Sequence, residues 1–228
     1  MAEGGGAPPA DAMLDSTPVV AVTGQIVTTW IGKDGFQEAD IIGITLPVTK
    51  HNWLVMNADE ISATIHDAFH VATSGRQGPV LVDIPRDVLQ KDIDFDADAF
   101  FPTPRYLPPR HADMPMLARA ADAIGKSKRP LLYVGGGAIA ADAWREVRTL
   151  AEKTRAPVTT TLMGKGAFPE SHPQSVGMLG MHGTAYANYA MHETDLIIAV
   201  GARFDDRVTG KLSAFAPHAK VIHIDVDA

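Results

Sequence analysis

The sequence predicts an α/β protein: an open, mainly parallel sheet in the second half, preceded by the C-terminal part of a second α/β domain. Two observations lead to this prediction. Short apolar runs of strand length alternate along the chain with stretches of helical periodicity. Small or polar residues follow several of these runs, as they do where parallel strands end at a ligand site.

In the first half, a β-branched run at 18–23 suits a buried strand. A helical stripe through Ile61, Ile65 and Ala68 follows and stops near Ser74-Gly75. The apolar run at 79–84 predicts a second strand, closed by Pro85. Strand, helix and strand in this order indicate parallel pairing through a crossover. Residues 25–58 show no clear period.

The second half repeats this alternation of helices and strands. We expect helices at 114–126, around 143–151 and within 179–192, and strands at 130–134, 158–161, 196–200 and 221–226. This order is typical of an open, mainly parallel sheet of Rossmann-like type with helices on both faces. Ligands of such sheets bind at the carboxyl ends of the strands.

Composition divides the chain into four segments. Residues 1–10 are rich in Gly, Pro and Ala and predict a disordered lead-in. Residues 11–90 form the first α/β part, and residues 113–228 form the second. Alternating aspartates and four prolines indicate a linker at 91–112. We expect the first part to leave apolar faces at 19–22 and 80–84 incompletely covered.

Charge and residue usage narrow the class of function. The net charge is -7 and no run of five or more Lys or Arg occurs, which argues against a nucleic-acid partner. The chain has no cysteine, so disulfides and thiolate sites are excluded, and a cytoplasmic location fits. No apolar run approaches the ~18–20 residues of a membrane helix, so we expect no membrane segment.

Two apparent metal motifs fail, and we predict no metal site in the chain. His66 and His70 have the i, i+4 spacing of a zinc helix, but no third ligand is recognisable nearby, which favours a pair on a helix surface. Asp92, Asp94 and Asp96 resemble the start of a calcium loop. The glycine and glutamate that such a loop needs are absent, because Ala97 and Thr103 stand there.

Three glycines and two charged loops are the candidate ligand-binding features. Gly135-Gly136-Gly137 after a strand would let the backbone approach a phosphate, although a plain tight turn explains the pattern equally well. Arg203 could clamp a diphosphate and Asp206 a sugar hydroxyl, or the two could belong to a solvated loop. Asp225 is placed like the acidic residue that accepts ribose hydroxyls, or is an ordinary strand-end aspartate.

Ordered motifs over residues 11–228 resemble the large subunits of acetolactate synthase (acetohydroxyacid synthase), which use thiamine diphosphate. The segments that carry this resemblance are Thr23-Gly24-Gln25, Asp34-Gly35-Phe36-Gln37-Glu38, Thr49-Lys50-His51-Asn52, Ala72-Thr73-Ser74-Gly75-Arg76, Gly78-Pro79-Val80-Leu81-Val82-Asp83-Ile84-Pro85, Thr161-Leu162-Met163-Gly164, Met178-Leu179-Gly180-Met181-His182-Gly183 and Phe204-Asp205-Asp206-Arg207-Val208-Thr209-Gly210-Lys211. They occur in order and with plausible spacing.

The resemblance implies an enzyme of valine, leucine and isoleucine biosynthesis that condenses two pyruvates, or pyruvate and 2-ketobutyrate, with thiamine diphosphate held by Mg²⁺. It makes residues 11–90 the C-terminal part of the pyrimidine-binding domain and residues 113–228 a nearly complete central domain that binds FAD. It also implies a homo-oligomer with a small regulatory subunit. Gln25, Phe36, Gln37 and Arg86 would line the substrate channel. The implied FAD site comprises Arg76, Gly135, Gly136, Gly137, Thr161, Leu162, Met163, Leu179, Met181, His182, Gly201, Arg203, Asp206, Val208 and Asp225.

The chain departs from the family pattern in several places. Arg86 stands where lysine is usual, Gly35 replaces alanine, and Thr28-Thr29 replaces pairs that end in arginine. The segment with the family's catalytic glutamate and the domain with its G-D-G…N motif are not found, so we expect a fragment that is inactive alone. An FAD-binding module without catalysis, or a related enzyme such as glyoxylate carboligase or pyruvate oxidase, is the alternative.

Overall fold

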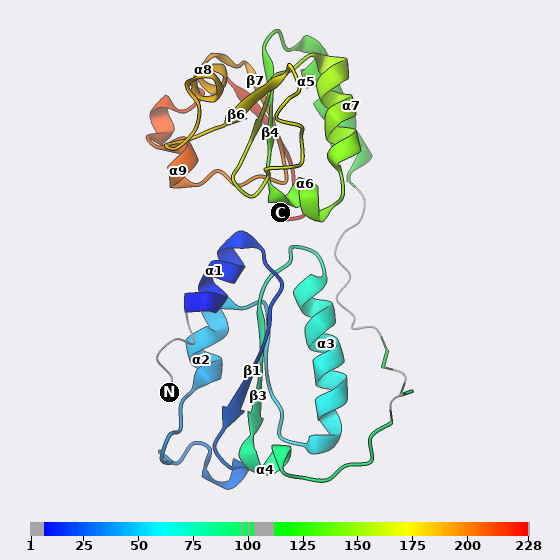
Figure 1. Cartoon of the computed structure of the whole chain (residues 1–228), viewed down its shortest axis with the longest axis vertical. Helices are drawn as coiled ribbons and strands as arrows, with labels where there is room; N and C mark the ends of the chain where they lie inside the picture. The colour runs from blue at the N-terminus through cyan, green and yellow to red at the C-terminus, as the bar shows by residue number, and fades with distance from the viewer. Residues whose placement is uncertain (1–6, 97, 100, 103–111, 228) are drawn as a thin grey trace. The chain divides into compact units, whose positions relative to one another are not determined.

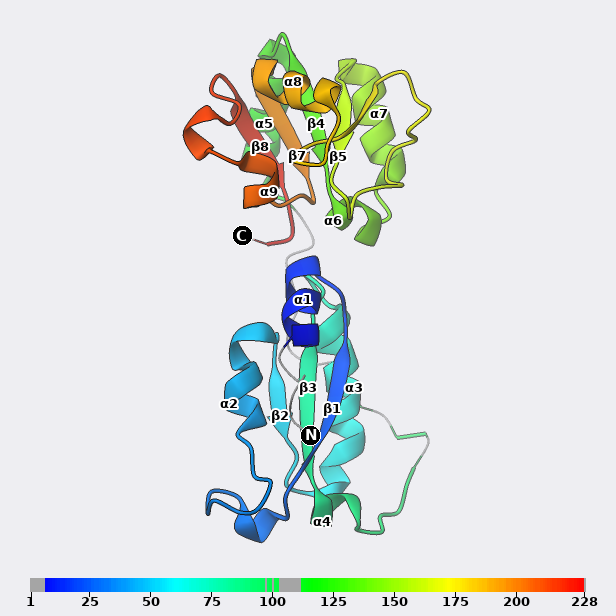
Figure 2. The ribbon, with the colours of Figure 1, turned by 60° about the vertical axis from the view of Figure 1, so that its left-hand side comes forward.

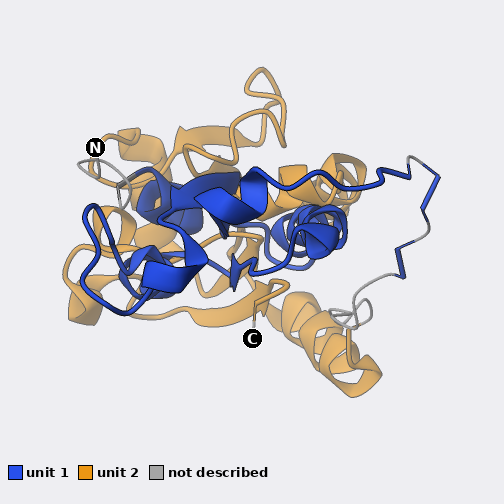
Figure 3. Ribbon diagram, turned by 90° about the horizontal axis from the view of Figure 1, so that it is seen from below, with its two compact units in different colours: residues 1–109 blue, residues 110–228 orange. Residues whose placement is uncertain are grey.

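The computed structural model describes residues 7–96, 98, 99, 101, 102 and 112–227. Contacts divide the chain into two compact units, residues 1–109 and residues 110–228, which are coloured separately in Figure 3. The division falls within the segment predicted as a linker.

The first unit contains a three-stranded parallel sheet in the order β1-β3-β2. Its strands are β1 (Val20–Gln25), β2 (Asn52–Leu54) and β3 (Val80–Pro85). The predicted parallel pairing of the first and last strands is confirmed, with Val20 opposite Val80. Strand β2 escaped prediction because three residues are too few to display a period.

Helices lie on both sides of this sheet (Figures 1 and 2). Helix α3 (Ile61–Thr73) packs through Ala68 and Ala72 on one face of β3, and Gly75 follows it with φ +60°, as its predicted stop requires. Helices α1 (Ala7–Asp15) and α2 (Ile41–Thr45) lie on the opposite side, and α4 (Arg86–Leu89) continues directly from β3. Short 3₁₀ turns occupy Thr28–Trp30, Leu46–Val48 and Ala58–Glu60.

Two expectations for the first unit are wrong in part. The predicted lead-in at 1–10 overlaps helix α1, which starts at Ala7; Pro8 and Pro9 fall in its first turn, where a missing N–H costs nothing. The rest of that lead-in, residues 1–6, lies outside the described residues. The apolar run at 80–84 is buried throughout, because β1 and β2 flank β3 and α3 covers one face. Val22 on β1 is 58% exposed, as expected.

The second unit is built on a five-stranded parallel sheet in the order β6-β5-β4-β7-β8, which confirms the predicted fold class. The strands are β4 (Pro130–Val134), β5 (Val158–Thr160), β6 (Ser175–Met178), β7 (Leu196–Val200) and β8 (Lys220–Ile224). Strand β6 was not predicted. Gly177 has φ +83° and the β5–β6 register shifts, so the sequence has no regular alternation there.

Helices cover both faces of this sheet. Helices α5 (Met114–Lys126), α6 (Gly136–Ala140) and α7 (Trp144–Thr154) pack on one face against Leu132, Val134 and Ile198. On the other face, α8 (Ala185–Glu193) packs against Leu131 and Ile197. Helix α9 (Asp206–Thr209) and a 3₁₀ turn at Leu212–Ala214 complete the unit.

The helix predicted within 179–192 begins later than expected, at Ala185. Gly180 has φ +102°, which no helix accommodates, and Thr184 Oγ1 accepts a hydrogen bond from Ala187 N at 3.1 Å as the N-cap. Residues 179–184 therefore form a loop. Across the described residues, none of the helices combines the length and apolar character needed to cross a membrane.

Candidate functional site

The carboxyl ends of the strands in the second unit bring most of the candidate residues to one edge of the sheet. Gly135 follows β4, Thr161 follows β5, Leu179 follows β6, Gly201 follows β7 and Asp225 follows β8, each directly. Because all five strands are parallel, these positions share one edge. This edge is the site that a Rossmann-like sheet offers to a ligand.

The glycines at this edge allow two turns of the protein to pack against each other. A Cβ atom on Gly135 would lie 2.1 Å from the Gly201 carbonyl oxygen, and one on Gly201 would lie 2.6 Å from Gly137 Cα. Gly137 N donates to Gly201 O at 3.0 Å, and Gly201 has φ +55°. The turns after β4 and β7 therefore need glycine for their mutual contact, a reason that the sequence did not reveal.

The loop after β5 presents apolar side chains. Thr161 Oγ1 accepts a hydrogen bond from Gly164 N at 2.9 Å and closes a tight turn. Gly164 is buried against Val134, while the side chains of Leu162 and Met163 are 69% and 49% exposed. The turn thus holds two flexible apolar side chains at the edge of the sheet.

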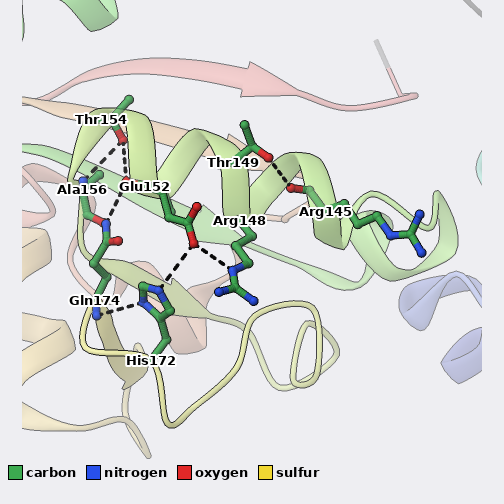
Figure 4. A network of polar contacts seen from close by, with 9 residues as sticks. Arg145, Arg148, Thr149, Glu152, Thr154, Ala156, His172 and Gln174 are labelled. Carbon is green, nitrogen blue, oxygen red and sulfur yellow. Dashed lines mark hydrogen bonds and ion pairs between the residues drawn. The ribbon is translucent and has the colours of Figure 1, made fainter.

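The far end of the same loop is fixed to α7 by Gln174 and His172 (Figure 4). Gln174 Nε2 donates to Ala151 O at 2.8 Å and to Ala156 O at 2.6 Å, so it bridges the two sides of the turn after α7. Gln174 N donates to His172 Nδ1 at 3.2 Å, and His172 Nε2 lies 3.9 Å from Glu152 Oε1. Sequence reasoning missed this anchor because its residues belong to no recognisable motif.

The loop after β6 carries Leu179, Met181 and His182. Leu179 is buried, whereas Met181 and His182 are exposed. Asn188 of α8 binds both backbone groups of Gly180: its Oδ1 accepts from Gly180 N at 3.1 Å, and its Nδ2 donates to Gly180 O at 3.2 Å. Met181 N donates to Arg207 O at 3.0 Å, which joins this loop to the one after β7.

The loop after β7 contains the charged candidates. Arg203 and Asp206 are exposed, and Val208 is half-buried. Asp205 Oδ1 caps α9 by accepting from Val208 N at 3.1 Å. A hydrogen bond from the sheet fixes the backbone of Arg203: the hydroxyl of the buried Tyr133 donates to Arg203 O at 3.1 Å. Burial raises the pKa of Tyr133, so this hydroxyl keeps its proton.

Asp225 lies beside a histidine of β8. His223 Nε2 is 2.8 Å from Ala202 O and 3.5 Å from Asp225 Oδ2. Asp225 Oδ1 also accepts from Asp227 N at 3.0 Å. The carboxylate therefore has a defined position at the end of the strand.

The substrate-channel candidates lie in the first unit. The amide of Gln25 is bound by the protein: Nε2 donates to Ala39 O at 2.8 Å and to Asp83 Oδ2 at 3.1 Å. Phe36 is 90% exposed, and the neighbouring Gln37 has φ +67°. Arg86 is exposed and is the first residue of α4.

Arg76, the remaining FAD candidate, also lies in the first unit. Its Nε donates to Ser16 Oγ at 3.0 Å and its Nη2 contacts Met13 O at 3.4 Å, which ties the turn after α3 to the end of α1. Among the described residues, no group of three or more His, Asp or Glu side chains could hold a metal ion.

Both units of the chain are similar to known proteins. Residues 117–228 match the family described as "Thiamine pyrophosphate enzyme, central domain". This part of the chain is therefore similar to the central domain of the thiamine pyrophosphate enzymes. Over 96% of its length the chain is 54% identical to "Acetolactate synthase" of Mycobacterium bovis and 53% identical to "Acetolactate synthase large subunit" of Corynebacterium glutamicum. It is 50% identical over 96% of its length to "Acetolactate synthase 1, chloroplastic" of Zea mays.

The resemblance to acetolactate synthase large subunits is therefore confirmed. The chain spans about a third of the length of these relatives: 36%, 35% and 34%, respectively.

Proposed function

We propose that the chain is part of an acetolactate synthase large subunit, which joins two pyruvates into 2-acetolactate with release of CO₂, or joins pyruvate to 2-ketobutyrate. The identity of 50–54% to proteins of that name supports this proposal. Thiamine diphosphate, bound with Mg²⁺ in the whole protein, supplies the carbon–carbon bond chemistry. Homo-oligomer formation, a small regulatory subunit and a cytoplasmic location belong to the same proposal.

We further propose that the second unit binds FAD at the carboxyl edge of its sheet. The observation that supports this is the gathering of the turns after all five strands at that edge. Their side chains suit a flavin dinucleotide: exposed apolar Leu162, Met163 and Met181 for the ring, Arg203 for the diphosphate, and Asp206 and Asp225 for hydroxyls. The remaining candidates in this unit lie in the same turns or in the short helices α6 and α9 that follow two of them.

In the first unit we assign Phe36, Gln37 and Arg86 to the substrate channel. Phe36 and Arg86 are exposed, as contact with a substrate requires. Arginine at position 86 keeps the positive charge that would attract a carboxylate substrate, and its planar guanidinium can bind that carboxylate with two hydrogen bonds. In this proposal residues 11–90 belong to the pyrimidine-binding domain and residues 91–112 link it to the central domain.

Titration of the 228-residue chain with FAD tests the cofactor proposal. We expect quenching of flavin fluorescence, and Arg203→Ala to weaken binding at least about tenfold, since a charge-assisted hydrogen bond is worth about 1.5–3 kcal/mol. Arg129→Ala is the matched control, because Arg129 precedes β4 at the opposite edge of the sheet and pairs with Glu193. No quenching at high micromolar FAD, or equal losses in both variants, would overturn the assignment.

A further inference from the structure

The side chain of Gln25 joins the two ends of an exposed loop. We call residues 26–39 the Phe36 loop. Gln25 Oε1 accepts a hydrogen bond from Ile26 N at 2.9 Å, at the start of the loop, and Gln25 Nε2 donates to Ala39 O at 2.8 Å, at its end. One amide group therefore closes the whole loop at its base.

The buried carboxylate of Asp83 holds this amide in place. Asp83 lies on the central strand β3, is 0% exposed, and receives the second N–H of Gln25 on Oδ2 at 3.1 Å. Its other oxygen accepts from Thr23 Oγ1 at 2.7 Å. Both N–H groups of Gln25 are thus used within the protein, so its amide has no donor left for a substrate.

The Phe36 loop needs such a closure because its own conformation is strained. Asp34 and Gln37, on either side of Phe36, have φ +55° and +67°, which costs non-glycine residues roughly 1 kcal/mol each. Two further carboxylates help to hold the loop in this conformation by accepting hydrogen bonds from it. Asp87 accepts from Thr28 N at 2.9 Å and Thr28 Oγ1 at 2.6 Å, and Glu38 accepts from Gly35 N at 2.9 Å and from Gly32 N.

We propose that Gln25 and Asp83 are positioning residues: together they hold the Phe36 loop closed and so fix Phe36 and Gln37 where a substrate would meet them. The positioning role rests on the proposed assignment of Phe36 and Gln37 to the substrate channel. The closure of the loop by Gln25 does not depend on that assignment. On the sequence alone, Gln25 itself is expected to line the channel. In this proposal Gln25 acts indirectly, by holding the loop that carries Phe36 and Gln37.

Limited trypsin digestion of the full chain tests this closure, because Lys33 is the only Lys or Arg in residues 26–39. Gln25→Met keeps the length of the side chain and removes its hydrogen bonds. We expect cleavage after Lys33 to become about tenfold faster relative to cleavage after Lys50, as opening of the loop becomes easier. Lys50 is half-buried and its Nζ binds Ser74 O, so its cleavage reports loss of the whole unit.

Thr23→Val is the matched control. This substitution also removes a hydrogen bond that Asp83 accepts, but that bond does not involve the ends of the loop. We expect the ratio of the two cleavage rates to stay within about twofold of the parent chain in this variant. Equal ratios in Gln25→Met and Thr23→Val would overturn the proposal and leave Gln25 with a merely structural role. Since neither readout uses FAD or turnover, this result is independent of the proposed function.

Discussion

Two carboxylates of the first unit accept hydrogen bonds from threonine yet have pKa values that shift in opposite directions. Burial raises the pKa of Asp83 above its usual value near 3.8, and the bonds from Thr23 and Gln25 only partly oppose that shift. The hydroxyl and N–H of Thr28 lower the pKa of Asp87, which is half-buried. One aspartate therefore favours its proton in the folded state, and the other favours its charge.

The difference predicts opposite pH profiles for two asparagine variants. As pH falls from about 7 towards about 4, the folded chain protonates Asp83 before the unfolded chain does, so the parent gains stability over Asp83→Asn. Below about pH 4 the unfolded chain protonates Asp87 before the folded chain does. The free energy of unfolding of the parent chain therefore falls relative to that of Asp87→Asn. In a Trp144→Phe background the remaining tryptophans, Trp30 and Trp53, report thermal unfolding of the first unit alone. Parallel profiles for the two variants would contradict this.

At the scale of elements, the regular helices and the central strands could be read from the sequence, whereas the elements rich in glycine could not. Helix α5 and strands β4 and β7 have the predicted bounds, because each has a clear period or a continuous apolar run. Helix α6 begins with Gly136-Gly137, which have poor helix propensity. It forms because Ala138 is buried in the core, a tertiary contact that no local pattern reveals.

In the candidate site, too, some features could be predicted from the sequence and others depend on tertiary contacts. The sequence placed the ends of four strands at one edge, since parallel order alone implies this. The groups that hold the loops there, such as Asn188 and Gln174, pair with backbone atoms of residues 8 to 23 positions away. Their side-chain chemistry is ordinary, so only the folded chain identifies them.

Asn188 is expected to fix the loop after β6 to helix α8. Asn188→Ala removes both hydrogen bonds to Gly180. Because the site is exposed, we expect each lost bond to lower the free energy of opening of this loop by no more than about 1.5 kcal/mol. We expect the amide of Gly180 to exchange hydrogen about tenfold faster in this variant. Tyr189→Ala, a change to the next residue of α8, which is also exposed, serves as the control. Unchanged exchange at Gly180 would show that the loop is held by other contacts.

At the scale of the molecule, the two units differ in how far their sheets are enclosed. In the second unit, both faces of the central strands β4 and β7 are covered by helices. In the first unit only β3 has strands on both sides, and β1 and β2 are edge strands among the described residues. Val22 on β1 and Leu54 on β2 are both exposed. Exposed edge strands with apolar side chains favour pairing between chains.

This difference predicts self-association through the first unit. We expect the sedimentation coefficient of the chain to rise with concentration, and Val22→Lys to reduce that rise, because a lysine on an edge strand opposes strand pairing between molecules. Leu212→Lys makes the same chemical change at an exposed site in a 3₁₀ turn of the second unit and should leave association unchanged. A chain that stays monomeric at high concentration, or equal effects of the two lysines, would mean that the edge strand β1 does not drive association.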